Sequence, residues 1–138
     1  MARVGYLVYC GNVDPMPDSK GGQQMSIINP YPEICLPYSP TAFSFTIVFG
    51  LCDISDDFMS GDKHSVKIIC KMDSGNVIFE SNDMPLDIPE DNKKRKIRGM
   101  QVSLEIRNAK FEDVGILKTS VLYDGEIIDE YEIPVVSD

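Results

Sequence analysis

The sequence predicts an all-β protein, folded as one antiparallel β-sandwich of about seven strands, with residues 1–138 forming a single domain. Most of the chain consists of short runs in which apolar and polar residues alternate, as is typical of strands with one buried face. Residues that favour turns separate these runs, and one pair of runs flanks Asp124-Gly125, a strong local signal for a β-hairpin. No segment has a sustained helical period with capping residues at its ends.

The N-terminal half predicts three strands. The first covers residues 3–10, which are rich in β-branched and aromatic side chains, and the composition of residues 11–24 predicts a loop. A short strand follows at 24–29. It leads into a proline-rich segment, residues 29–40, which must lie at a sheet edge or form a crossover because proline cannot donate to a sheet ladder. The strongest predicted strand is 41–54, because its aromatic residues fall on one face.

The C-terminal half predicts two hairpins and a strand between them. The first hairpin turns at Asp73-Ser74-Gly75, where glycine supplies the positive φ that a tight turn requires. The second turns at Asp124-Gly125, which suits a type I′ turn because that turn needs a positive φ at both central residues. The predicted strands of this half are residues 64–72, 76–81, 100–108, 116–123 and 126–136.

Composition limits the classes of function. The chain has 138 residues and a formal net charge of −9, from 22 acidic and 13 basic residues. Such acidity disfavours binding to nucleic acid, whose phosphates attract basic surfaces, and favours solubility or a partner with a basic face. No apolar run approaches the roughly 18 residues that suggest a membrane span, and the N-terminal segment lacks the apolar core of a signal peptide. We therefore expect a cytoplasmic protein with no membrane association.

Cysteine and histidine are too sparse to indicate a metal centre. The four cysteines lie far apart and form no Cys-x-x-Cys pair, whereas structural zinc sites take paired ligands from tight turns. We expect free thiols that are largely buried in strands, and neither a metal nor another cofactor. The cysteines are Cys10, Cys35, Cys52 and Cys70.

No group of residues indicates catalysis. A nucleophile activated by an imidazole would require His64, the single histidine, which stands at the entry to a predicted strand as many solvated histidines do. The acidic residues 53–62 depart from the calcium-loop pattern, and both a weakly bound cation and a solvated hairpin tip remain open there. Neither of the glycine-rich phosphate-binding motifs occurs. The sequence therefore predicts a protein that is not an enzyme and has no catalytic residues.

Two segments are candidate binding surfaces. One is a block of five basic residues within positions 93–98 of an acidic chain. It could bind an acidic partner, or its charge could prevent sheet edges of different molecules from pairing. The proline- and aromatic-rich residues 30–43 combine a stiff backbone with tyrosine rings, which suits a protein interface, or they could cover one open end of the sandwich. The candidate partner-binding residues are Tyr31, Pro32, Tyr38, Lys93, Lys94, Arg95, Lys96 and Arg98.

Residues 103–119, "SLEIRNAKFEDVGILKT", resemble the corner between two strands of an immunoglobulin domain. Asp113 and Gly115 match the turn, but Leu117 stands where the corner tyrosine would be and Thr119 where the disulfide cysteine would be. The chain also has no tryptophan to pack against such a disulfide. We therefore expect an immunoglobulin-like or related topology without the disulfide, and no receptor function.

The order of segments resembles a family of small bacterial and bacteriophage proteins of unknown function. "YLVYCGN" ends the first strand, "QMSIINPYPEI" follows a polar loop, and "PTAFSFTIVFGL" is a proline-led aromatic strand. The hairpin "DSGNVIFES" and the closing "DVGILKTSVLYDGEIIDEYEIPVV" complete a pattern that covers nearly the whole chain. The resemblance implies a β-sandwich and a prokaryotic or phage setting, and it transfers no site residues.

These observations together predict a non-enzymatic protein-binding module. Its most concrete form is a bacterial or phage accessory protein that binds and modulates a host or partner protein. The alternative is a structural or assembly protein that forms homo-oligomers through exposed sheet edges. A nucleic-acid partner is not expected because the chain is acidic.

Overall fold

The fold is built entirely from β-strands in the part of the chain that can be described. The computed structural model describes residues 2–17, 23–54, 63–86 and 99–138. These residues form no helix, and therefore no helix that could cross a membrane. The strands are β1 (Arg3–Pro17), β2 (Gln23–Pro30), β3 (Ile34–Leu36), β4 (Thr41–Cys52), β5 (Ser65–Met72), β6 (Val77–Glu80), β7 (Met84–Pro85), β8 (Met100–Phe111), β9 (Gly115–Tyr123) and β10 (Glu126–Ser137).

The all-β prediction is confirmed, but the predicted number of strands is wrong. The described residues contain ten strands rather than about seven. Two of the additional strands, β3 and β7, have only three and two residues, too few for an alternating pattern to be visible in the sequence. The predicted basic block, residues 93–98, lies outside the described residues.

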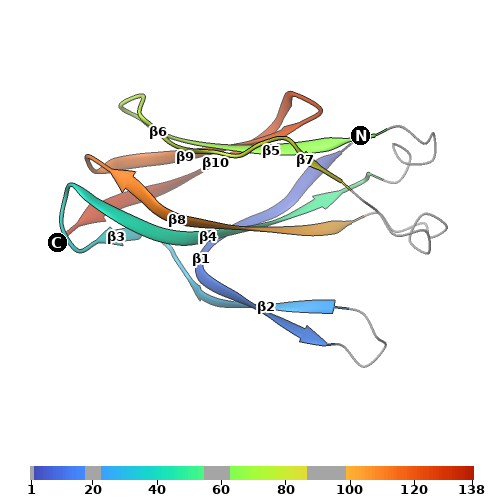
Figure 1. Cartoon of the computed structure of the whole chain (residues 1–138), viewed down its shortest axis with the longest axis horizontal. Helices are drawn as coiled ribbons and strands as arrows, with labels where there is room; N and C mark the ends of the chain where they lie inside the picture. The colour runs from blue at the N-terminus through green and yellow to red at the C-terminus, as the bar shows by residue number, and fades with distance from the viewer. Residues whose placement is uncertain (1, 18–22, 55–62, 87–98) are drawn as a thin grey trace.

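Ten strands form two sheets that lie one above the other in Figure 1. One sheet has four strands in the order β2-β1-β4-β8, and the other has the order β3-β10-β9-β5-β6, with β7 beside β5. Neighbouring strands are antiparallel except for β3, which runs parallel to β10. This parallel pairing places the proline-rich segment at a sheet edge, as its sequence predicts.

A single hydrophobic core fills the space between the two sheets. On β4 the predicted inward face is confirmed, because Phe45, Ile47 and Phe49 are all fully buried. The facing sheet contributes Ile68 from β5 and Leu117 from β9, which are also fully buried. Leu117 therefore contributes its side chain to the packing between the sheets.

A buried hydrogen bond connects the two sheets through the core. The hydroxyl of Tyr9 on β1 donates to Thr119 Oγ1 on β9 at 2.6 Å, and Cys70 Sγ on β5 lies 3.5 Å from the same oxygen. Burial raises the pKa of Tyr9 well above its ordinary value and that of Cys70 to about 11, so both groups keep their protons at neutral pH. Thr119 therefore links the two sheets through a buried polar contact.

Strand β1 changes partners at Cys10. Residues Arg3 to Cys10 pair with β4, and residues Cys10 to Pro17 pair with β2. The second half of β1 and β2 form a two-stranded arm (residues 11–17 and 23–30) that diverges from the rest of the four-stranded sheet in Figure 1. The sequence predicts a loop over residues 11–24, and this is wrong for the described part of it. The glycine and the prolines of this segment favour a loop in the sequence, but the segment forms a strand because it pairs with β2.

Candidate functional site

Three connections meet at one end of the molecule, at the left of Figure 1. They are residues 37–40 between β3 and β4, residues 73–76 between β5 and β6, and residues 112–114 between β8 and β9. We call these three connections together the loop end. Ser39 Oγ donates a hydrogen bond to the carbonyl of Glu112, and the Asp73 amide donates to the carbonyl of Ile116. The first bond joins two of the connections, and the second joins the turn 73–76 to strand β9.

Two exposed apolar side chains lie on neighbouring connections of the loop end. Tyr38 is 62% exposed and Val114 is 46% exposed, whereas Val77, which is 57% exposed, lies on β6 at the opposite edge of the larger sheet from β3. Tyr38 follows β3, which is anchored by the buried side chains of Ile34 and Leu36 and by its pairing with β10. A tyrosine on a short loop fixed at both ends loses little conformational entropy on binding, which favours its use in an interface.

The sequence-predicted binding residues separate into different environments. Tyr38 and Pro32 are exposed, as an interface requires. Tyr31 instead lies partly buried at the base of the arm: its ring centroid is 6.3 Å from that of Phe43, and its amide donates to the Tyr9 carbonyl at 2.7 Å. Its hydroxyl oxygen also lies close to Gly11, where an added Cβ would come within 3.2 Å of it. Tyr31 therefore packs against both β1 and β4.

The remaining predicted binding residues lie outside the described residues; they are Lys93, Lys94, Arg95, Lys96 and Arg98.

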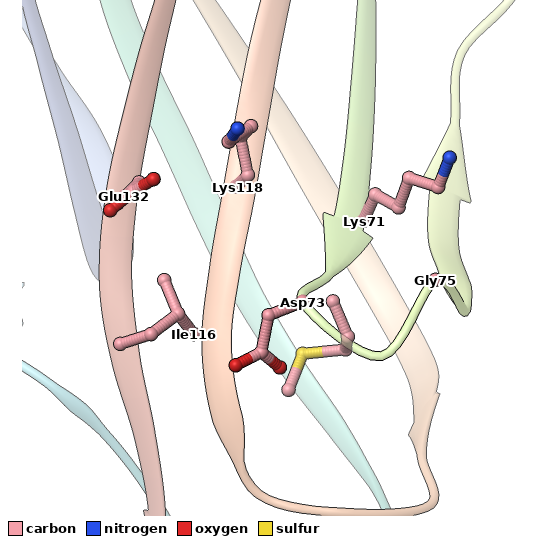
Figure 2. A pocket seen from close by; sticks show the side chains of 7 residues that line it. Lys71, Asp73, Gly75, Ile116, Lys118 and Glu132 are labelled. Atoms are coloured by element: carbon pink, nitrogen blue, oxygen red, sulfur yellow. The ribbon is translucent and has the colours of Figure 1, made fainter.

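A polar hollow of about 480 Å³ adjoins the loop end on the outer face of the larger sheet (Figure 2). Lys71 on β5, Lys118 on β9 and Glu132 on β10 form a row, because each is paired directly with the next. Neither ammonium group forms a salt bridge with a described residue. Like charges placed directly opposite each other on neighbouring strands are unfavourable, so a carboxylate from a binding partner would stabilise the Lys71–Lys118 pair.

The turn between β5 and β6 joins this hollow to the loop end. Asp73 and Gly75 belong to the turn and also line the hollow. Figure 2 shows the Asp73 carboxylate directed toward β9, where an added Cβ on Gly115 would come within 2.5 Å of it. The sequence does not indicate this site because the two lysines are 47 positions apart in the chain and only the strand register places them together.

His64 is held in place by neighbouring side chains. Its Nδ1 is 2.6 Å from Asp124 Oδ2, its ring stacks on Tyr123, and its side chain is largely buried. Asp124 Oδ1 also accepts a hydrogen bond from the Ser65 amide. These contacts connect the start of β5 to the turn between β9 and β10, which is a structural role. The solvated position expected from the sequence is wrong for this side chain.

The described residues contain no group of three or more histidine, cysteine, aspartate or glutamate side chains arranged to hold a metal ion. All four cysteines are free, as the sequence predicts. Cys10 and Cys70 are buried, whereas Cys35 is exposed and Cys52 is intermediate, so the expectation of buried thiols is correct for two of them.

A comparison with solved structures finds a similar fold in the alkylpurine DNA glycosylase AlkC of Pseudomonas fluorescens bound to DNA containing an abasic site analog. The two share 13% sequence identity with a TM-score of 0.53, and the match covers 98% of this chain and 30% of that chain. At this identity the likeness concerns the fold alone.

No curated protein matches the chain. A sequence profile does match it, over residues 12–136, and describes a family of unknown function. This range includes all the strands from the second half of β1 to β10. The prediction of membership in a family of unknown function is thus confirmed: the chain belongs to DUF6941.

Proposed function

We propose that the protein is a non-enzymatic binding module that holds another protein at its loop end. The observation that supports this most is the exposure of Tyr38 and Val114 on two connections that are joined by the hydrogen bond from Ser39 to the Glu112 carbonyl. Protein interfaces commonly combine an apolar centre rich in aromatic residues with a polar rim. The hollow beside the loop end supplies such a rim, with lysine and carboxylate side chains for a partner's charged groups.

The proposal includes an immunoglobulin-like β-sandwich in a single domain. The order β10-β9-β5 corresponds to strands G-F-C of an immunoglobulin domain, and the pairing of β4 with β8 corresponds to B-E. The short β3, parallel to β10, then precedes the strand equivalent to B. In this scheme the arm is an addition at the N-terminal side of the sandwich.

The setting that we propose is the cytoplasm of a bacterium, in which the protein acts as a bacterial or phage accessory factor that modulates its partner. The free state of all four cysteines supports a reducing compartment. The resemblance of the segment order to bacterial and phage proteins supports the biological setting.

The experiment is affinity purification from a bacterial lysate with three forms of the chain. The unmodified protein should recover one partner in stoichiometric amount. The double variant Tyr38→Ala, Val114→Ala should recover at least about tenfold less, since truncating a tyrosine at the centre of an interface costs about 2 kcal/mol or more and about 1.4 kcal/mol is a factor of ten. The control Ile127→Ala truncates an exposed residue at the opposite end and should bind normally. Equal recovery by all three forms, or no partner for any, would contradict the proposal.

A further inference from the structure

Among the described residues five strands have a free edge, and four of them carry features that oppose pairing with another strand. They are β2 and β8 in one sheet and β3, β6 and β7 in the other. Strands β3, β6 and β7 have only three, four and two residues, and the register of β6 against β5 is irregular. Short and irregular edges are the usual means by which proteins prevent association through their sheets.

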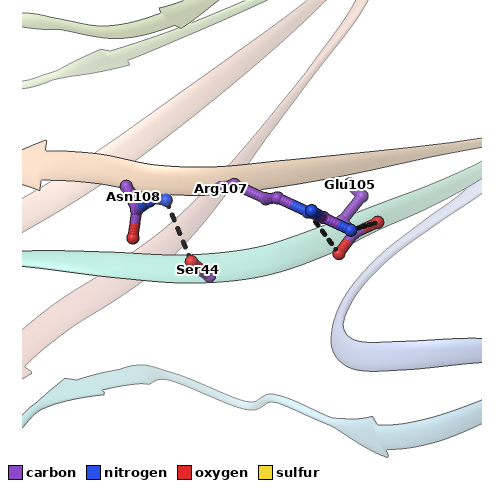
Figure 3. A network of polar contacts seen from close by, with 4 residues as sticks. All are labelled: Ser44, Glu105, Arg107 and Asn108. Carbon is purple, nitrogen blue, oxygen red and sulfur yellow. Dashed lines mark hydrogen bonds and ion pairs between the residues drawn. The ribbon is translucent and has the colours of Figure 1, made fainter.

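The long edge strand β8 is protected by a bulge and by charge (Figure 3). Arg107 and Asn108 together oppose Ser44, Asn108 has a φ of 55°, and its amide donates to Ser44 Oγ at 2.9 Å. Arg107 also donates two hydrogen bonds to the Glu105 carboxylate, at 2.9 and 3.2 Å. A strand added here would meet a distorted backbone and charged side chains.

Strand β2 is longer than β3, β6 and β7 and carries no charge. Its eight residues contain no charged side chain, although a quarter of the chain is charged. Its register with β1 is regular from Pro17–Gln23 to Asn12–Ile28, and the left-handed φ of 55° at Asn29 affects only the end of the strand near Cys10. Ile28 is 38% exposed, and Met25 and Ile27 are only partly buried. A long, uncharged edge that is regular over most of its length is the type of edge that accepts another strand.

The arm would gain stability from an added strand. Beyond Cys10 it consists of two strands, since β2 pairs with β1 alone among the described strands. A two-stranded hairpin is at best marginally stable in water, whereas three or more strands can support one another. Pro15 and Pro17 weaken it further because neither can donate a hydrogen bond to the ladder.

We propose that the free edge of β2 pairs antiparallel with β2 of a second copy of the chain, forming a dimer about a two-fold axis. Copies with a net charge of −9 repel each other, so self-association requires a surface that does not place carboxylates opposite one another. Uncharged β2 meets that condition when it pairs with itself. Two-fold pairing also gives the free β2 edge of each copy a hydrogen-bonding partner, and it leaves no further β2 edge for a third copy. This dimer is independent of the partner proposed for the loop end.

Light scattering coupled to size-exclusion chromatography tests the dimer on the full chain. The unmodified protein should have twice the 15.4 kDa chain mass at high concentration. Ile28→Lys places a charge on the edge in both copies and should raise the dissociation constant at least about tenfold. The matched control, Val77→Lys, places the same charge at an exposed apolar position on β6 and should leave the dimer unchanged. Circular dichroism should show that both variants are folded.

Amide hydrogen exchange locates the contact. Dilution of the dimer should accelerate exchange in β2 and leave β8 unchanged. A monomer at every concentration, a dimer that survives Ile28→Lys, or a dimer that Val77→Lys dissociates equally would overturn the proposal. A monomer that binds a different protein through β2 would overturn it as well, because the edge would then serve another occupant. The double variant Tyr38→Ala, Val114→Ala should remain dimeric, so the two proposals can fail separately.

Discussion

At the scale of single residues, Thr119 is the side chain on which the buried polar link depends. Thr119→Val keeps the shape of the side chain but leaves the Tyr9 hydroxyl buried without its partner. An unsatisfied buried hydroxyl costs about 1–3 kcal/mol, so the free energy of unfolding should fall by that amount. Urea unfolding followed by circular dichroism measures the loss.

A double-mutant cycle separates this hydrogen bond from packing. Removing both polar partners, with Tyr9→Phe and Thr119→Val together, should cost less than the sum of the two single changes, because no hydroxyl is left unsatisfied. Additive costs would show that the 2.6 Å contact contributes no coupling.

The sequence predicts what is lost at this position but not what replaces it. Thr119 in place of cysteine excludes the immunoglobulin disulfide. Its actual partner, Tyr9, is 110 positions away, and no local pattern relates the two. The role of Tyr31 is not predictable from the sequence either, because a tyrosine between prolines can contact a binding partner or pack against its own strands. The contact of its ring with Phe43 shows that it packs within the protein.

At the scale of elements, the bulge in β8 depends on the backbone conformation of Asn108. Its φ of 55° is tolerated by asparagine and glycine but is unfavourable for a β-branched residue. We expect Asn108→Val to lower the free energy of unfolding by about 1–2 kcal/mol, and Asn108→Gly to change it by less. Thermal or urea unfolding of the two variants measures the difference. If valine is tolerated as well as glycine, the left-handed conformation is not required there.

Hairpins with glycine in the turn are the elements that the sequence predicts best. Asp124 and Gly125 have φ values of 51° and 85°, as a type I′ turn requires, and Gly75 has a φ of 104°. These turns are specified by adjacent residues. The second half of β1 is not specified by adjacent residues, because its prolines and glycine favour a loop. It forms a strand only through pairing with β2. Elements that depend on distant partners are therefore the ones that the sequence leaves out.

At the scale of the whole molecule, the sequence predicts the class of fold but not the arrangement of its parts. Alternation along each run shows which face is buried, yet it does not say which strands are neighbours. The parallel pairing of β3 with β10 joins residues about a hundred positions apart. The Lys71–Lys118 row and the loop end arise from such pairings, so both surfaces become visible only when the sheets are assembled.

The same arrangement predicts that the arm and the core open separately. Cys70 is buried in the core between the sheets, whereas Cys10 is buried at the root of the arm and is not part of that core. Under native conditions an alkylating reagent should modify exposed Cys35 first, Cys10 at the rate of local arm opening, and Cys70 last. The raised pKa of Cys70, about 11, slows its reaction further because the thiolate is the reactive form.

Mass spectrometry of the modified chain over time gives the three rates, and low concentrations of urea distinguish local from global opening. Modification of Cys70 should accelerate steeply with urea, because exposing it requires the two sheets to separate. Modification of Cys10 should respond weakly, because only the two-stranded arm and the pairing of Cys10 with Thr46 at its base have to open. If both thiols react at one rate with one urea dependence, the arm unfolds together with the core, and β2 needs no further strand to stabilise it.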